Sequence, residues 1–420
     1  MKLTKISLAA LVALGAFSSV ASATPLEEAI KNVDLSGFAR YRYTNTHEKN
    51  RVAKEVTKGS VANHQFRMVT NFKAAIDDNF FGVIGLRYSA NDGSGDNARS
   101  SAWRVDDQGQ NEKVTYNGTD KTNTTGTFGV HQFYLGYNVG GTTITAGKQA
   151  IGSYFTDDAV GTGVRVVNKD IEGLTLTALA FDAISSDWAD GDLYSKTGSL
   201  NSYDVGNLYA AGIAGSYDPI NFQLWYASLT NLADLLAADV SANFAITNDV
   251  SLGARLNYVN STADASAKSK LSYNDGNFYA GELSTSLFGF DLAGGYIGWK
   301  AQDKKVSAFT FEDQGSLIDA GEDVFDWTHA EGKGNFFYAT SAYTFDKFTA
   351  GLDYVRGDIK TAGVNSNKDR KEKIEEFVPR FAYQYNKKLK FSSFYAFKTS
   401  KVDSDKDKTD KFRFEAKYSF

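Results

Sequence analysis

Hydrophobic and polar residues alternate one by one along most of the chain beyond Val33. Side chains two positions apart lie on the same face of a β-strand, so each alternating run predicts a strand with one apolar and one polar face. The last ten residues show the pattern most clearly. Their apolar face would carry Phe412, Phe414, Ala416, Tyr418 and Phe420, and their polar face Lys411, Arg413, Glu415, Lys417 and Ser419.

The predicted strands are joined alternately by very short turns and by longer polar links. Eight short turns are expected, at Asp77–Asn79, Gly140, Asn168–Glu172, Asp218-Pro219, Asn248, Gly289, Asp346-Lys347 and Asn386–Lys388. Nine longer links are expected, at about 45–61, 92–126, 151–160, 185–205, 230–236, 261–275, 303–333, 361–371 and 403–408. Together they join about 18 strands, with 16 as the alternative count, because each single strand gives a weak signal.

No apolar stretch after the first 23 residues reaches the ~18–20 residues that a membrane-spanning helix needs. If the chain crosses a membrane, it must do so as a closed barrel, the other structure that satisfies every backbone group in lipid. The composition, with 38 Gly, 30 Phe and 23 Tyr but only 3 Pro, agrees with alternating strands joined by turns. We therefore predict an all-β, transmembrane antiparallel barrel with short periplasmic turns and long extracellular loops. A soluble β-sandwich is disfavoured by the terminal aromatic residue and by arginines at positions that alternate with apolar ones.

The N-terminus has the three parts of a secretory signal peptide: Lys2 and Lys5, an apolar run over 6–17, and the small residues Ala21-Ser22-Ala23. We expect cleavage after Ala23, export through the periplasm, and a barrel domain over 24–420 in the bacterial outer membrane. A short helix is expected over 24–30. The absence of cysteine fits an exported protein and excludes thiolate metal sites and cysteine nucleophiles.

The strand alternation places several arginines on the polar faces, between apolar neighbours. An arginine on the lipid side near the membrane midplane would cost about 2–4 kcal/mol, so these side chains should point into the lumen. They are Arg40, Arg42, Arg67, Arg255, Arg380 and Arg413. They would either form a basic wall at the constriction of a pore or only balance lumen carboxylates; alternation does not decide between the two.

Acidic residues concentrate in the predicted loops. The candidate constriction residues among them are Asp157, Asp158, Asp192 and Glu312. Loops folded over a basic wall would set up a transverse electric field, whereas solvated surface carboxylates are the alternative. The chain carries 50 acidic and 45 basic residues, and no basic domain stands apart, so no nucleic-acid partner is expected.

Several short runs resemble the Campylobacter-type major outer membrane porin family, in order along the whole chain. They include Thr24–Lys31, Gly37–Tyr43, Ala74–Phe80, Ala146–Gln149, Val160–Asn168, Ile171–Leu176, Val205–Tyr209 and Glu312–Leu317. The resemblance implies an 18-stranded homotrimeric porin for ions and small hydrophilic solutes, with the third extracellular loop folded into the lumen. It also implies a possible calcium ion at the constriction, held by Asp158, Asp192 and Glu312; no other cofactor is expected. The third loop is shorter than in the family, which weakens the match at Asp158.

The terminal aromatic residues Tyr418 and Phe420 resemble the signal that the barrel assembly machinery reads in outer-membrane barrels. We therefore expect this machinery and outer-membrane lipid as partners. The function we predict is a general diffusion porin, mildly cation-selective because acidic residues exceed basic ones. The alternative is an adhesin on a barrel scaffold that binds host or environmental ligands through its long loops. No enzyme is expected, since the four histidines lack metal-ligand spacing and no nucleophile or phosphate-binding motif appears.

Overall fold

The computed structural model describes residues 33–52, 55–95, 99–105, 111–117, 126, 128–156, 159–184, 206–271, 273–310, 317–325, 329–362, 369–403 and 405–420. Over this part the chain forms a closed antiparallel barrel of 18 strands, which confirms the predicted fold class and strand number. The expected signal peptide and the short helix over 24–30 lie outside the described residues. No helix in the described part is both long and apolar enough to span a membrane.

The first half of the barrel wall comes from nine strands. They are β1 (Val33–Val52), β2 (Glu55–Ala75), β3 (Phe80–Gly95), β6 (Gly129–Val139), β7 (Thr142–Ala150), β8 (Val160–Asn168), β9 (Leu174–Ile184), β10 (Leu208–Tyr217) and β11 (Ile220–Leu229). The second half comes from the remaining nine. They are β12 (Ala233–Thr247), β13 (Val250–Ala263), β14 (Gly276–Leu287), β15 (Phe290–Ala301), β18 (Lys333–Phe345), β19 (Phe348–Thr361), β20 (Arg370–Gln384), β21 (Leu389–Val402) and β22 (Asp405–Ser419).

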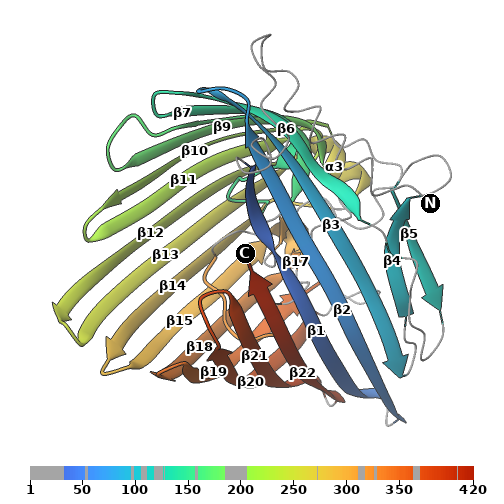
Figure 1. The fold of residues 1–420 in the computed structure, drawn as a ribbon. Helices are drawn as coiled ribbons and strands as arrows, with labels where there is room; N and C mark the ends of the chain where they lie inside the picture. Colours follow the sequence, from blue (N-terminus) through green and yellow to red (C-terminus); the bar gives the residue numbers. More distant parts are fainter. Residues whose placement is uncertain are drawn as a thin grey trace.

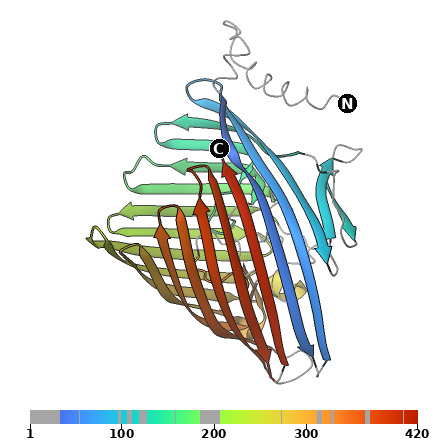
Figure 2. The ribbon, with the colours of Figure 1, turned by 60° about the horizontal axis from the view of Figure 1, so that its bottom comes forward.

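Each wall strand pairs with its neighbours in chain order, and the last strand pairs with the first (Figures 1 and 2). Phe38 lies opposite Ser419 in this closing pair. Beyond it, the N–H of Gly37 donates to the carbonyl of Phe420 at 3.0 Å, and the N–H of Phe420 donates to the carbonyl of Gly37 at 3.1 Å. The barrel therefore has no open edge at this seam.

The eight predicted short turns all separate consecutive wall strands. Each is made by residues suited to sharp reversal, such as Gly140-Gly141 and the exposed Asp346, which has a positive φ of 51°. The strand ends at the opposite end of the barrel were predicted less well. β1 and β2 continue as a paired hairpin through most of the expected loop 45–61, because their backbone hydrogen-bonding continues where the apolar pattern has already ended.

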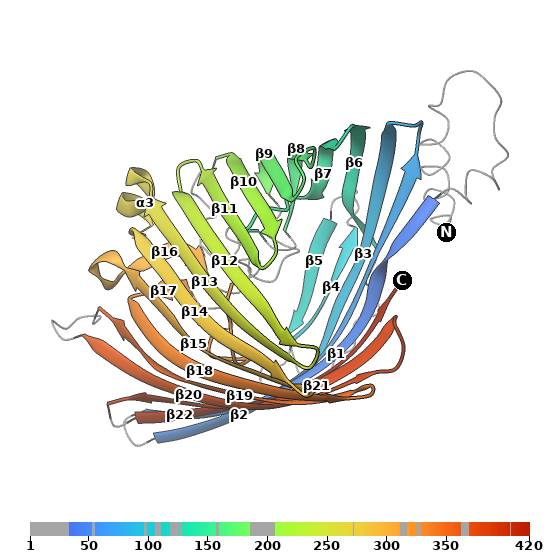
Figure 3. The ribbon, with the colours of Figure 1, turned by 90° about the vertical axis from the view of Figure 1, so that its left-hand side faces the viewer.

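Three of the longer links contain structure of their own. Residues of the 92–126 link form the hairpin of β4 (Arg99–Val105) and β5 (Asn111–Asn117), which stands beyond β3 in Figure 1. The link after β13 contains the short helix α3 (Ala265–Lys270), at the long-loop end of β13 and β14 in Figure 3. The link between β15 and β18 contains the 3-10 turn η1 (Gln302–Lys304) and the small pair β16 (Val306–Thr310) and β17 (His329–Glu331).

The two faces of the wall differ as the alternation predicts. Large apolar side chains are exposed on the outside, for example Leu256 at 65%, Leu283 at 72% and Phe337 at 67% of their surface. An outward belt of this kind is what lipid contact requires. Side chains of Arg255 and Glu282, which alternate with Leu256 and Leu283, line an interior cavity.

A hydrophobic core lies inside the barrel, where two inward-folded segments pack against the wall. The first is the third loop, of which residues 151–156 and 159 are described; its Ile151, Phe155 and Ala159 are completely buried. The second is residues 317–325, which we call the lumen strap; Ile318 and Phe325 belong to the same cluster. The inward third loop confirms the prediction, whereas no pattern in the sequence singled out the strap.

Candidate functional site

The candidate site is the barrel lumen, and two cavities mark it. The larger has a volume of about 710 Å³ and the smaller about 450 Å³. Residues near the short turns line both: Ser251, Asp291 and Lys390 the larger, and Gly173, Ser216 and Asn221 the smaller. The two cavities share Asn243 and Ser284. They therefore lie side by side in the half of the lumen toward the short-turn end. Small hydroxyl side chains from Ser251, Ser284, Thr340 and other strand positions leave room for water there.

Four of the six candidate arginines contribute to these cavities. Arg42, Arg380 and Arg413 line the larger one, together with Lys390, and Arg255 lines the smaller one. Arg40 and Arg67 lie directly opposite each other on β1 and β2, on the same face of the sheet as Arg42.

The arginines lie next to carboxylates on neighbouring strands. Arg255 donates to Asp239 through two nitrogens, at 3.1 and 2.6 Å. Arg42 donates to Glu415 from Nε at 2.8 Å, and Arg40 lies 3.9 Å from the same carboxylate.

Asp239 and Asp353, the latter a partner of Arg380, were missed because the acidic residues were expected in loops. Glu415 was placed on the polar face of the last strand but was not recognised as a partner of an arginine. Asp239, Asp353 and Glu415 lie within strands, each between two outward residues, such as Leu352 and Tyr354 around Asp353. The alternation that identified the arginines could therefore have identified these carboxylates as well. The inner wall therefore carries both acidic and basic side chains, many of them in ion pairs, and is not uniformly basic.

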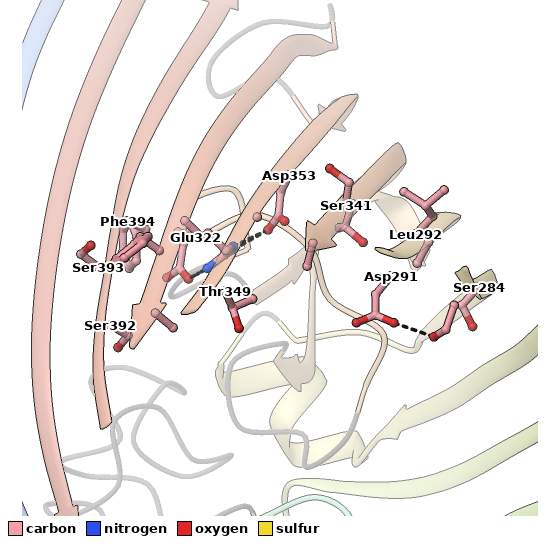
Figure 4. Close-up of a pocket in the computed structure, with 18 of the residues that line it drawn as sticks. Ser284, Asp291, Leu292, Glu322, Ser341, Thr349, Asp353, Ser392, Ser393 and Phe394 are labelled. Atoms are coloured by element: carbon pink, nitrogen blue, oxygen red, sulfur yellow. Dashed lines mark hydrogen bonds and ion pairs between the residues drawn. The ribbon is translucent and has the colours of Figure 1, made fainter. Parts of the chain in front are cut away.

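Arg380 is the centre of a network of ion pairs and hydrogen bonds in the lumen. Its Nε and Nη2 donate to Asp353 at 2.8 and 2.5 Å, its Nη1 pairs with Glu322, and its Nη2 also donates to the carbonyl of Gly321 at 2.7 Å. Figure 4 shows Glu322 and Asp353 converging on this group, with Phe394 nearby. A carboxylate of the wall and a carboxylate of the lumen strap thus share one guanidinium.

Four acidic residues were predicted for the constriction and the calcium site. Asp157, Asp158, Asp192 and Glu312 all lie outside the described residues, and so does the calcium site they would form. Within the described ranges, no three His, Asp or Glu side chains are placed to hold a metal ion. Tyr418 and Phe420 lie at the closing seam, where their rings are 5.9 Å apart between centroids.

Comparison with solved structures shows the same fold in several bacterial proteins. Pseudomonas aeruginosa OpdQ superposes with a TM-score of 0.63 at 14% identity, covering 92% of this chain and 99% of that one. Pseudomonas aeruginosa OprD gives 0.62 at 13% identity, over 93% and 95%. Acinetobacter baumannii OccAB3 gives 0.60 at 12% identity, over 92% and 99%. At these identities the likeness establishes the fold alone.

Sequence comparison identifies the family. No curated protein sequence matches this chain significantly. A family profile described as Campylobacter major outer membrane protein, however, matches residues 1–418. This agrees with the short runs that carried the resemblance, which extend from 24–31 to 312–317. The chain belongs to the Campylobacter major outer membrane protein family.

Proposed function

We propose that this protein forms a water-filled outer-membrane channel through which ions and small hydrophilic solutes diffuse passively. The observation that supports it best is the closed 18-stranded barrel with a charged, hydroxyl-rich cavity of about 710 Å³ inside. A barrel of this strand number is too wide for wall side chains alone to fill. Family membership supports the outer membrane as its location, with the short turns on the periplasmic side.

The proposed mechanism is screening by size and charge. The third loop and the lumen strap occupy part of the cross-section, so a solute must pass the space that they leave. Fixed charge pairs along that path hold water and favour polar solutes over apolar ones. Diffusion of this kind requires no catalytic group, and we propose a channel rather than an enzyme.

A mild preference for cations is our proposal for the selectivity. The larger cavity carries four basic side chains (Arg42, Arg380, Lys390, Arg413) and four acidic ones (Asp291, Glu322, Asp353, Glu415). The smaller carries Arg255 against Asp239 and Glu282. The slight acidic excess along the path supports cation preference, because the sign of the lining charge biases ion entry. A zero-current potential in a potassium chloride gradient that favours chloride would contradict it.

Liposome swelling tests the channel itself. Proteoliposomes of the purified protein should swell in isosmotic sugars, fastest for the smallest sugar and progressively slower as the sugar becomes larger. Protein-free liposomes and liposomes with heat-unfolded protein are the controls. No swelling with any sugar or amino acid would contradict the proposal and favour the adhesin, whose lumen could be closed.

Calcium binding and trimer formation are further proposals, and both rest on the family resemblance. Equilibrium dialysis should show calcium bound to the wild type and lost in the D158N/D192N/E312Q variant; absence of binding to the wild type would contradict the site.

Chemical cross-linking of the folded protein in detergent should give a species three times the mass of the monomer. A monomer at all cross-linker concentrations would contradict the trimer.

A further inference from the structure

The lumen strap presents two adjacent carboxylates to four cationic side chains of the wall. Glu322 pairs with Arg380 and lies 3.6 Å from Arg413. Asp323 pairs with Lys398 at 2.6 Å and with Lys411 at 3.0 Å. The four cations come from β20, β21 and β22, which are neighbours in the wall.

These cations are gathered at one place by the wall itself. Arg380 and Arg413 both lie opposite Phe394 in the strand register, and their guanidinium carbons are 5.8 and 5.1 Å from its ring centroid. Lys411 is almost fully buried. Positive charges gathered this closely repel one another unless opposite charges are placed among them, and here the carboxylates of the strap lie among them.

The strap is held by more than these ion pairs. The carboxylate of Glu376 is fully buried and accepts the backbone N–H groups of Glu322 and Val324, each at about 3.2 Å. Lys398 also donates to the carbonyl of Asp323 at 3.0 Å. Ile318, Ala320, Val324 and Phe325 are buried in the lumen core. Because of these contacts, neutralising the two carboxylates should leave the strap docked.

The charge balance at this point depends on the strap. The wall supplies four cations against the carboxylate of Asp353 and the fully buried Glu376, so that Glu322 and Asp323 offset most of the remaining positive charge. Glu322, Arg380 and Arg413 line the larger cavity, where passing ions would experience this balance. Without the charges of the strap, this section of the lumen would carry a net positive charge.

We propose that Glu322 and Asp323 are the residues that determine the charge selectivity of this channel, by cancelling a fixed positive patch on β20–β22. This inference rests on the proposed channel function. It assigns charge selectivity to the lumen strap, which is a different segment from the third loop. The six arginines predicted to line the pore would not set the selectivity without these carboxylates.

The test is the zero-current potential of three near-isosteric double variants in planar bilayers. E322Q/D323N removes two lumen carboxylates, and its potassium-to-chloride permeability ratio should fall at least about threefold. K398Q/K411Q removes two lumen cations and should raise the ratio by a similar factor. D78N/D346N removes two carboxylates at exposed short turns and should leave the ratio within experimental scatter. Heat-modifiable migration on gels establishes that each variant is folded.

The possible outcomes separate this inference from the function on which it rests. Opposite shifts in the two lumen variants, with none in the turn variant, support it. Unchanged ratios in both folded lumen variants, in channels that conduct like the wild type, would overturn it while leaving the channel intact. Absence of any conductance in the wild type would instead overturn the proposed function.

Discussion

Gly321 is the residue at which the lumen strap turns against the barrel wall. Its φ of +84° lies in the region that residues with a side chain rarely adopt. A β-carbon there would lie 2.3 Å from Oε2 of Glu376 and 3.2 Å from Val355. The glycine therefore allows the buried carboxylate of Glu376 to reach the backbone N–H groups of the strap.

We predict that Gly321→Ala destabilises the folded barrel with its docked strap by about 1–3 kcal/mol, because it adds backbone strain and a clash with a carboxylate oxygen. The measurement is the free energy of unfolding from a urea titration in detergent micelles. Gly294→Ala is the matched control, since a β-carbon at this wall glycine would meet its nearest neighbour at an ordinary 3.5 Å. Equal free energies for the two variants would show that the close approach at Gly321 is not needed.

At single positions, alternation predicted orientation well and interaction partners poorly. The register confirms that Arg40 and Arg42 share a face, with Tyr41 on the other. The acidic partners Asp239 and Asp353 were missed, although they obey the same period of two. The pairing of Glu322 with Arg380 spans 58 residues and depends on how a loop folds, which no local pattern encodes.

At the scale of elements, the short turns are the connections that the sequence predicts most reliably. In the turn before β9, Asp170 accepts the N–H of Gly141 at 2.6 Å, as well as the side-chain amide of Asn168. These hydrogen bonds to the ionised form, the one from Gly141 first, lower the pKa of Asp170 below its usual value. Because the carboxylate ties the β6–β7 turn to the β8–β9 turn, it stabilises the folded state.

Because protonation of Asp170 and folding are coupled, the lowered pKa makes the stability of the folded protein depend on pH. A carboxyl whose pKa is lower in the folded state contributes stability above its unfolded pKa, and that contribution is lost as the pH falls through the folded pKa. We therefore predict that the wild type is more stable than Asp170→Asn at neutral pH, and that the difference shrinks below about pH 4. Urea titrations at pH 7, 5 and 3 measure it. A difference that is constant across these pH values would contradict the assignment.

The closing pair of strands supports a prediction about assembly. Phe420 exchanges two backbone hydrogen bonds with Gly37, so deleting it removes the last pairing between β22 and the start of β1. We expect a Phe420 deletion to lower the amount of folded protein in the outer membrane several-fold, while the channels that do insert conduct normally. Quantifying heat-modifiable protein in outer-membrane fractions is the measurement, with Tyr418→Phe as a conservative control. Wild-type amounts of the truncated barrel would contradict the role of this residue.

Strand ends were predicted accurately only where contact with lipid requires apolar side chains on the outer face up to the end of the strand. All eight short turns follow directly from the end of an apolar face. At the other end, β1, β2 and β3 continue as paired strands beyond the apolar pattern, because backbone pairing does not require lipid-facing side chains. The β4–β5 hairpin and the lumen strap lie in links that alternation could only leave as loops.

At the scale of the whole molecule, the barrel combines an apolar belt outside with a partly filled lumen inside. The third loop and the lumen strap carry hydrophobic residues inward and bury them against the wall, so the interior holds both a core and polar cavities. Many of the charges along the cavities form ion pairs between neighbouring strands or between wall and strap, such as Arg255 with Asp239 and Arg380 with Glu322. Fixed pairs of this kind keep the path hydrated without a large net charge, which is why we expect weak rather than strong selectivity.

Single-channel recording in planar bilayers tests the central proposal most directly. Purified, folded protein added to one side of a membrane in potassium chloride should produce uniform, long-lived conductance steps, with a zero-current potential that weakly favours potassium. Heat-unfolded protein at the same concentration should produce none. Folded protein that inserts, as shown by co-flotation with the lipid, yet gives no discrete steps would contradict an open channel.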